Sequence, residues 1–309
     1  MLSVDRMRVL HAIAANGSLT GAAEELHVTN SAVSQQLSKL EREVGQPLVE
    51  RNGRGIRLTE AAEVLVEHTG QILSLVRQAE ADLEAHRDAV IGHLRLSSIA
   101  TAARGLVPHA LVTLRESHPR LVVELSEQEP QDSVPAVSRG EADMAVVVDW
   151  TGAPLPLPRG MERTPLTEDT ADIALPAGHP LAHRGLVALD EVVDLPWISW
   201  PRGGACGQWL HQMISAQGAE PRIVHTAEEH QTKLSLVASG LGAAVIPRLG
   251  RGPVPEGVRL VQVQPALVRQ VYVFWNADAA RRPAISATVR ALREAACRME
   301  PGTVSSRPQ

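Results

Sequence analysis

The stretch that most constrains this chain is residues 17–59, because its apolar and polar side chains are spaced as in two short helices joined by a tight turn. Thr20 is the expected N-cap of the first helix, and Ala22-Ala23 give that helix an apolar face that a second helix can approach closely. The turn falls at His27-Val28, and Thr29 is the expected cap of the second helix. The pattern predicts a helix-turn-helix.

The second helix has one apolar and one polar face. Val33, Leu37 and Leu40 recur at i, i+4 and i+7 and are predicted to face the core. The opposite face is small and polar, which suits base edges in the major groove of DNA, although a solvated helix face has the same character. The residues predicted to bind DNA from this helix are Thr29, Asn30, Ser31, Ser34, Gln35, Ser38 and Lys39.

A basic hairpin follows. Asn52-Gly53 is a strong turn signal, and Arg51, Arg54 and Arg57 fall within seven residues of one another. Beside a recognition helix these arginines would reach phosphates or a minor groove, whereas a merely solvated basic turn is the alternative. The three arginines complete the predicted DNA-binding set and make the fold a winged helix-turn-helix.

This stretch resembles the LysR-type transcriptional regulators. The matching residues are Ser18-Leu19-Thr20, Ala22-Ala23, Leu26, Ala32-Val33-Ser34, Gln36-Leu37, Leu40-Glu41, Gly45, Pro47-Leu48, Arg51 and Leu58-Thr59. The chain departs from the family at Leu10 and Val49, where an aromatic residue is usual, and at Ala62, where glycine is usual. The first two remain apolar, and the third favours a helix. The resemblance implies a sequence-specific transcriptional regulator that is controlled by a small-molecule effector.

Residues 60–90 form a long proline-free stretch with apolar residues at seven-residue intervals. Pairing of this helix with a second copy would place two recognition helices on one two-fold symmetric DNA site, whereas packing against its own chain is the alternative. The residues predicted to form the dimer are Leu65, Ile72, Val76, Ala79 and Leu83. The resemblance extends this expectation to a dimer of dimers.

Charge is distributed unevenly along the chain. The 309 residues have a formal net charge of -5. Residues 1–59 nevertheless hold seven Lys/Arg against six Asp/Glu, while residues 60–89 hold two against seven. Such a modestly positive reading head predicts that double-stranded promoter DNA is bound tightly only by a dimer. Aromatic residues make up 2% of the chain, which disfavours a stacking surface for single strands.

The sequence lacks the signals that mark several other classes of protein. No apolar run is long enough to span a bilayer and the first residues are polar, so we expect a cytoplasmic protein without a membrane partner. Two cysteines do not make a disulfide framework, and the twelve histidines form no tight ligand motif, so neither a metal nor a cofactor is expected. Because no nucleophile elbow, Walker loop or dinucleotide fingerprint is present, we do not expect an enzyme.

From residue 91 the pattern changes to alternating strands and helices, which predicts an α/β sheet. We expect two lobes, with lobe one formed by 91–163 and 268–299 and lobe two by 164–267, and crossovers near 163–166 and 266–269. The proline-rich loop 151–165 has no periodicity, and the polar tail 300–309 is predicted to be disordered. Gly140-x-x-Asp143 and Gly178-His179-Pro180-Leu181 resemble landmarks of the LysR effector domain, which implies a fold like that of periplasmic solute-binding proteins.

Ligands of open α/β sheets bind beyond the carboxyl ends of the strands. The residues predicted at these ends, and so predicted to bind the effector, are Ser98, Thr101, Gln128, Ser199, Arg202, Gly203, Cys206 and Thr226. Ser and Thr at helix starts also serve as plain N-caps. Arg202 beside two glycines suggests an anionic group such as a carboxylate, and a solvent-exposed arginine is the alternative.

Cys206 supports a further hypothesis. It opens a predicted helix, where the helix dipole lowers the pKa of a thiol, and its place resembles that of the reactive cysteine in peroxide-sensing members of the family. No second cysteine follows until Cys297, so a small cap or pocket residue is the alternative. Three functions therefore compete with an effector-controlled regulator: a redox-sensing regulator that acts through Cys206, a two-lobed small-molecule-binding protein without a DNA role, and an enzyme on the two-lobed fold.

Overall fold

The structure is a computed structural model that describes residues 2–26, 28–52, 55–85, 90–201 and 203–299. The chain divides into two compact units, Met1–Leu83 and Glu84–Gln309. The first unit contains α1 (Val4–Asn16), α2 (Leu19–Glu25), α3 (Asn30–Val44), the hairpin of β1 (Val49–Asn52) and β2 (Gly55–Leu58), and most of α4 (Glu60–Ala85). The predicted helix-turn-helix is therefore confirmed. The tail 300–309 lies outside the described residues.

The N-cap of α2 is Ser18, and the prediction of Thr20 was wrong. Ser18 has an extended backbone, and its Oγ accepts a hydrogen bond from the backbone N–H of Gly21 at 3.0 Å. Thr20 lies inside the helix, where its Oγ1 accepts from Asn30 Nδ2 at 3.3 Å. The cap of α3 is Thr29, as predicted, with its Oγ1 3.2 Å from the N–H of Ala32.

The core of this unit lies between the first three helices and the start of α4. Leu10, Val33 and Leu40 are fully buried, as is Ala22, whose small side chain lets α2 pack closely against its neighbours. Ala62 is fully buried in the first turn of α4. A glycine at this position would weaken the helix, so alanine anchors α4 to the reading head.

The second unit is built on one long sheet. Over the described residues its strands lie in the order β4-β3-β5-β12-β6-β11-β7, and β10 also pairs with β6. These strands are β3 (Gly92–Ser98), β4 (Leu121–Glu127), β5 (Met144–Trp150), β6 (Met161–Pro176), β7 (Leu186–Ala188), β10 (Ala244–Pro247), β11 (Val258–Gln264) and β12 (Leu267–Asn276). A separate pair is formed by β8 (Trp197–Ser199) and β9 (Ile223–Thr226). The predicted α/β class is confirmed.

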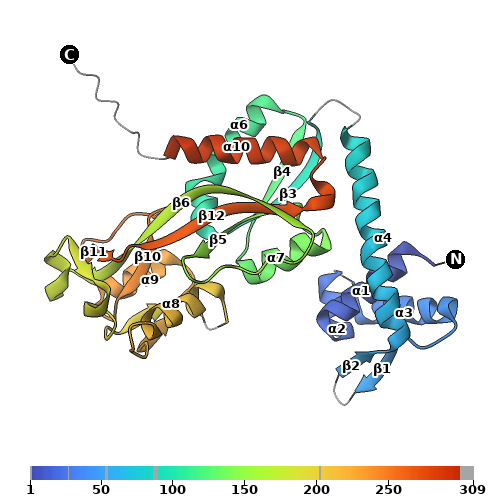
Figure 1. Cartoon of the computed structure of the whole chain (residues 1–309), viewed down its shortest axis with the longest axis horizontal. Helices are drawn as coiled ribbons and strands as arrows, with labels where there is room; N and C mark the ends of the chain where they lie inside the picture. Colours follow the sequence, from blue (N-terminus) through green and yellow to red (C-terminus); the bar gives the residue numbers. More distant parts are fainter. Residues whose placement is uncertain (1, 27, 53–54, 86–89, 202, 300–309) are drawn as a thin grey trace. The chain divides into compact units, whose positions relative to one another are not determined.

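The helices of this unit are α5 (Ala100–Gly105), α6 (Val107–Ser117), α7 (Pro130–Arg139), α8 (Ala205–Ser215), α9 (His230–Ala238) and α10 (Pro283–Met299). In lobe one, α6 and α10 lie side by side over the sheet (Figure 1), and the core beneath them includes Leu96, Val146 and Leu292. In lobe two a second core surrounds Trp197 and Leu210. Short one-turn helices cover 180–183, 189–191 and 277–279.

The two lobes are joined by strands where the sequence predicted a loop. Of the proline-rich segment 151–165, residues from Met161 onward belong to β6, whose residues 161–171 pair with the whole length of β12 (Figure 1). The ladder shifts register at Val271/Tyr272, opposite 165–167. Proline has no N–H to donate, and Pro165 is tolerated within a strand because it lies at this irregularity.

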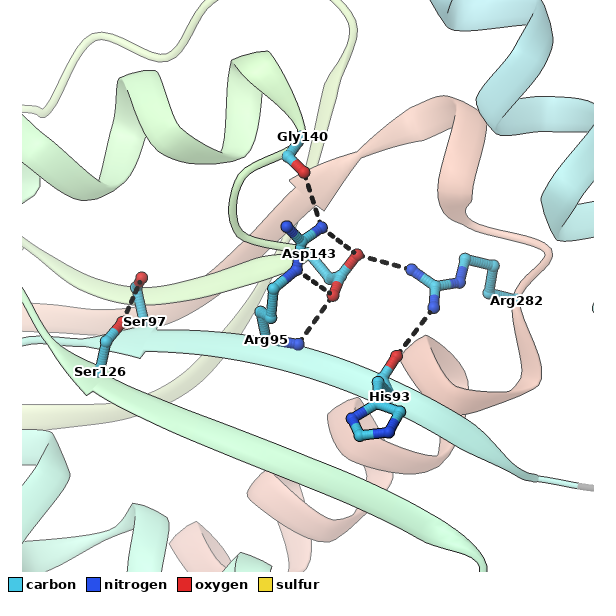
Figure 2. Close-up of polar contacts among 7 residues, drawn as sticks. All are labelled: His93, Arg95, Ser97, Ser126, Gly140, Asp143 and Arg282. Atoms are coloured by element: carbon cyan, nitrogen blue, oxygen red, sulfur yellow. Dashed lines mark hydrogen bonds and ion pairs between the residues drawn. The ribbon is translucent and has the colours of Figure 1, made fainter. Parts of the chain in front are cut away.

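Asp143 ties three segments of lobe one together (Figure 2). Its carboxylate accepts hydrogen bonds from the backbone N–H of Arg95 at 2.7 Å and from Arg282 Nη1 at 2.7 Å. Arg95 Nη2 also donates to the carbonyl of Gly140 at 2.6 Å, and Arg282 Nη2 donates to the carbonyl of His93 at 3.1 Å. The Gly140-x-x-Asp143 motif thus fastens the end of α7 to β3 and to the segment before α10.

Candidate functional site

The polar face of α3 is open to solvent. Val33, Leu37 and Leu40 are buried on the opposite face, as predicted. The exposed residues are Thr29, Asn30, Ser31, Ser34, Gln35 and Ser38, and Lys39 is half-buried beside them. This surface carries hydrogen-bonding groups at helical spacing and, apart from Lys39, no charge. Such a face can read base edges while the rest of the unit holds the helix in place.

The hairpin lies next to α3 in the sequence and supplies the wing. Its two strands pair in antiparallel register, with Glu50 opposite Arg57 and Arg51 opposite Ile56. Arg57 is exposed on β2. Arg54 and the side chain of Arg51 lie outside what the structure describes, so their role as phosphate contacts stays a prediction.

The first half of α4 packs against its own chain, whereas the second half is exposed as a dimer surface would be. Leu65 and Ile72 are half-buried and pack against the core of the N-terminal unit. Leu83 is 66% exposed, and Val76 and Ala79 are exposed as well. Leu75, which was not among the predicted dimer residues, is 65% exposed on the same half of the helix. The second half of α4 therefore presents an apolar surface that its own unit does not cover.

A cavity of about 190 Å³ lies where α7 of lobe one meets α8 of lobe two. It is lined by Glu129 and Gln131 from the start of α7 and by Trp200, Pro201, Gly203, Gly204, Ala205, Cys206 and Glu228 from lobe two. Of the predicted effector residues, Gly203 and Cys206 line this cavity. Arg202 lies outside the described residues.

The remaining predicted effector residues do not line the cavity. Ser98 is buried and its Oγ donates to the carbonyl of Ile99 at 3.1 Å. Gln128 Oε1 accepts from Ser97 Oγ at 2.9 Å. Ser199 is buried, whereas Thr226 is exposed. The polar groups at these strand ends thus serve the protein's own contacts or face solvent, and their role toward an effector stays a prediction.

Thr101 accepts a hydrogen bond from a buried ion pair, Asp169–Arg269, that was not predicted from the sequence. Arg269 Nε donates to Asp169 Oδ2 at 2.8 Å, and Arg269 Nη2 donates to Thr101 Oγ1 at 2.9 Å. The other oxygen of Asp169 accepts from the backbone N–H of Leu249 at 2.9 Å. Asp169 and Arg269 are 100 residues apart and are cross-strand neighbours on β6 and β12, so no local pattern could show the pair.

Lys233 and His230 lie buried on α9 beside Trp200. The Nζ atom of Lys233 is 3.2 Å from the centre of the Trp200 ring and finds no hydrogen-bond partner among the described residues. Burial lowers the pKa of Lys233 well below its usual range and lowers the pKa of His230 to about 2. A sequence signal existed: residues 230, 233, 234 and 237 form the i, i+3, i+4, i+7 stripe of a buried helix face.

Two carboxyl groups shape the electrostatics of the described part of the cavity, and the anion site expected at Arg202 stays a prediction. Burial raises the pKa of Glu129, and the neighbouring Glu228 raises it further. Both carboxyl groups line the cavity. Lys233 and Arg269 lower the pKa of Glu129, but burial outweighs them, so the site beside Glu129 favours a proton or a further positively charged group.

Cys206 occupies the second position of α8, yet its thiol does not become acidic. The side chain is 8% exposed, and burial raises the pKa of the thiol. Trp150 Nε1 donates a hydrogen bond to Sγ at 3.4 Å. The sequence expectation of a pKa lowered by the helix dipole was therefore wrong, because burial outweighs the dipole. A protonated thiol is a poor nucleophile toward peroxide, so this geometry gives the redox hypothesis no support.

Membrane-spanning helices and metal sites are two further features that the sequence disfavoured. No helix in the described part of the chain has both the length and the apolar character that crossing a membrane requires. Among the same residues, no three His, Cys, Asp or Glu side chains are grouped so that they could hold a metal ion.

The N-terminal and C-terminal units of the chain match two different family models. Residues 4–63 match the model of the bacterial regulatory helix-turn-helix protein of the lysR family, and residues 87–297 match the LysR substrate binding domain. The probable HTH-type transcriptional regulator LrrA of Synechococcus elongatus is 28% identical over 305 residues, which cover 96% of this chain and 98% of that protein. The HTH-type transcriptional regulator IlvR of Caulobacter vibrioides is 28% identical over 295 residues, covering 95% and 98%.

Solved structures share the fold. A full-length OxyR variant from Pseudomonas aeruginosa superposes with a TM-score of 0.66 at 22% identity, over 95% of both chains. Full-length BenM gives a TM-score of 0.57 at 22% identity, over 95% of this chain and 96% of that one. With both domain models matched in order along the chain, the protein belongs to the LysR family of DNA-binding transcriptional regulators with an effector-binding domain.

Proposed function

We propose that this chain is a cytoplasmic regulator without enzymatic activity that binds double-stranded promoter DNA through α3 and the β1–β2 hairpin. The observation that carries this proposal is the exposed polar face of α3, held by the Thr29 cap and by the buried Val33, Leu37 and Leu40. Asn, Gln and Ser on that face match the donors and acceptors of base edges, and Arg57 on the wing would contact the DNA backbone.

The second half of α4 supports a homodimer. Ile72, Val76, Ala79 and Leu83 are spaced four, three and four residues apart, which is the seam of a two-stranded coiled coil. Val76, Ala79 and Leu83 are exposed in a single chain, and Ile72 is half-buried, so this seam leaves apolar surface that a second copy would cover. Two reading heads on one DNA duplex would offset the modest positive charge of each, and family resemblance extends the assembly to a dimer of dimers.

The effector is proposed to bind in the cavity between α7 and α8. Because one wall comes from each lobe, a ligand there has a different affinity for an open and a closed arrangement of the lobes. Such differential affinity is what allows a small molecule to shift the placement of the reading heads. Gly203 and Cys206 would contact the effector as predicted, together with the other residues that line the cavity.

The test is binding of the full-length protein to DNA from just upstream of its own coding sequence, across a salt series and against scrambled DNA. We expect the specific DNA to bind more tightly and the affinity to fall steeply with salt. Replacing Ser34 and Gln35 together by alanine should weaken specific binding by about tenfold or more, since each good base contact contributes about 1–3 kcal/mol.

The matched control is Gln71→Ala, an exposed polar residue on α4 away from the proposed face. It should leave affinity for the specific DNA unchanged. If the Ser34/Gln35 double variant binds as tightly as the parent while folding normally, the recognition helix is misplaced.

A further inference from the structure

The lining of the cavity between α7 and α8 combines two kinds of polar group. The first kind is a pair of carboxyl groups, those of Glu129 and Glu228, and burial together with the charge of Glu228 raises the pKa of Glu129. Trp200 supplies an aromatic wall. Two carboxyl groups and an aromatic face are what an ammonium group prefers, because the carboxylates neutralise its charge and the ring attracts it.

The second kind of polar group is a set of hydrogen-bond donors at the start of α8. Ala205 and Cys206 open α8, an 11-residue helix whose N-cap Gly204 provides no side-chain cap. The first N–H groups of a helix have no acceptor within the helix and favour an anion. Behind Trp200, the Nζ atom of Lys233 is buried and has no hydrogen-bond partner among the described residues. A buried amine without a partner is costly unless an acceptor arrives.

The charges of the two glutamates affect the pKa of Lys233, yet the Lys233 amine makes no hydrogen bond with either of them. Glu129, Glu228 and Cys206, all of which line the cavity, act on the pKa of Lys233. Burial nevertheless dominates and favours the uncharged form of both Lys233 and Glu129. A ligand with a positive and a negative group would restore both charges at once.

We propose that the effector is a zwitterion, namely a free α-amino acid or a close analogue. Its ammonium group would lie against Glu129 and Glu228, and its carboxylate would lie against the first turn of α8, while the Lys233 amine, buried behind Trp200, would supply positive charge without touching the ligand. The volume of about 190 Å³ fits this class, since it equals the liquid volume of about six water molecules and is smaller than a typical drug-sized pocket. This inference rests on the proposed function, because it takes the cavity as the effector site.

The experiment uses the full-length protein and the twenty common L-α-amino acids as probes. Thermal unfolding followed by tryptophan fluorescence reports on the cavity-bearing unit, because all five tryptophans lie in Glu84–Gln309. At least one amino acid should raise the midpoint temperature. The acid lacking its amino group and the amine lacking its carboxylate should each bind at least about tenfold more weakly, since each loses charged hydrogen bonds.

Three variants and a control locate the effect. Glu129→Gln, Glu228→Gln and Lys233→Met should each reduce affinity for the amino acid by about tenfold or more. Glu220→Gln removes one negative charge from an exposed position outside the cavity and should leave that affinity unchanged. Should Lys233→Met fail to fold, the two glutamate variants still decide the question.

Several results would overturn the proposal. They are no stabilisation by any of the twenty amino acids, equal binding of the deaminated acid or of the decarboxylated amine, and unchanged affinity in both glutamate variants. Promoter binding is measured on the same preparation. Intact DNA binding without amino acid binding overturns this inference alone, whereas amino acid binding without DNA binding supports it and counts against the proposed function.

Discussion

Removing the carboxylate of Asp169 should destabilise the effector-binding unit more than any surface change. The side chains of Asp169 and Arg269 are 5% and 3% exposed, and 2.7 Å separates Arg269 Nη2 from Asp169 Oδ2. Asp169→Ala would leave the guanidinium buried without its counter-charge and the N–H of Leu249 without its acceptor. Breaking one side of such a pair costs about 3–5 kcal/mol of unfolding free energy.

This magnitude is large enough to measure directly. A unit of this size shifts its midpoint temperature by about 2–4 °C per kcal/mol, so the expected loss is roughly 6–20 °C. Tryptophan fluorescence of the full chain follows this unit alone, since the N-terminal unit contains no tryptophan. Thr101→Val removes only one acceptor from Arg269 and should cost about 1 kcal/mol.

A double variant tests the reason for the loss. Asp169→Leu combined with Arg269→Met replaces the pair by apolar side chains of similar size, which leaves no buried charge unpaired. It should be more stable than Asp169→Ala. A shift below about 2 °C for the single variant, or a double variant at least as unstable, would refute the reasoning that an uncompensated charge is the cause.

Three further predictions concern single positions. Ser18→Ala should cost about 0.5–2 kcal/mol by removing the cap of α2, whereas Thr20→Ala should cost little, as urea unfolding would show. Gly250→Ala should destabilise strongly, because φ is +61° and a Cβ atom would come within 2.1 Å of the carbonyl oxygen of Thr101, whereas Gly178→Ala meets open space. Since burial lowers the pKa of His230 to about 2, its unfolded form binds a proton more readily. Stability should therefore be fully present above pH 6.5 and fall by up to about 1.4 kcal/mol per pH unit below it, a dependence that His230→Gln should lose.

The reading head could be predicted because its signals are local. The stripe of Val33, Leu37 and Leu40 and the Thr29 cap lie within one helix, and each follows from sequence spacing alone. Even there the predicted cap of α2, Thr20, lies two residues after the observed cap, Ser18, whose backbone is extended. The order of strands and helices after residue 91 was equally accessible from periodicity.

The lining of the cavity between α7 and α8 could not be predicted in the same way. Contacts between residues far apart in the sequence decide which polar groups remain available to bind a ligand. Gln131 and Gly204 come from different lobes and meet only after both have folded. Position after a strand led to the prediction of Gly203 and Cys206, which line the cavity, but this rule says nothing about which polar groups already bind other parts of the protein. Lys233 was overlooked because a lysine is normally exposed, although its place in a buried stripe gave the opposite signal.

The two lobes are joined by the long paired strands β6 and β12, which limits the movements that an effector could cause. Asp169 and Arg269 are cross-strand neighbours on β6 and β12, and Thr101 adds α5 to the same cluster. Arg269 also lies 5.5 Å from the Trp150 ring centre, so the cluster reaches the end of β5. Strands joined by a buried ion pair resist separation, whereas no such pair joins the cavity walls at α7 and α8 among the residues that the structure describes. We therefore expect ligand-induced movement to change the separation of α7 and α8 while the sheet around Asp169 stays fixed.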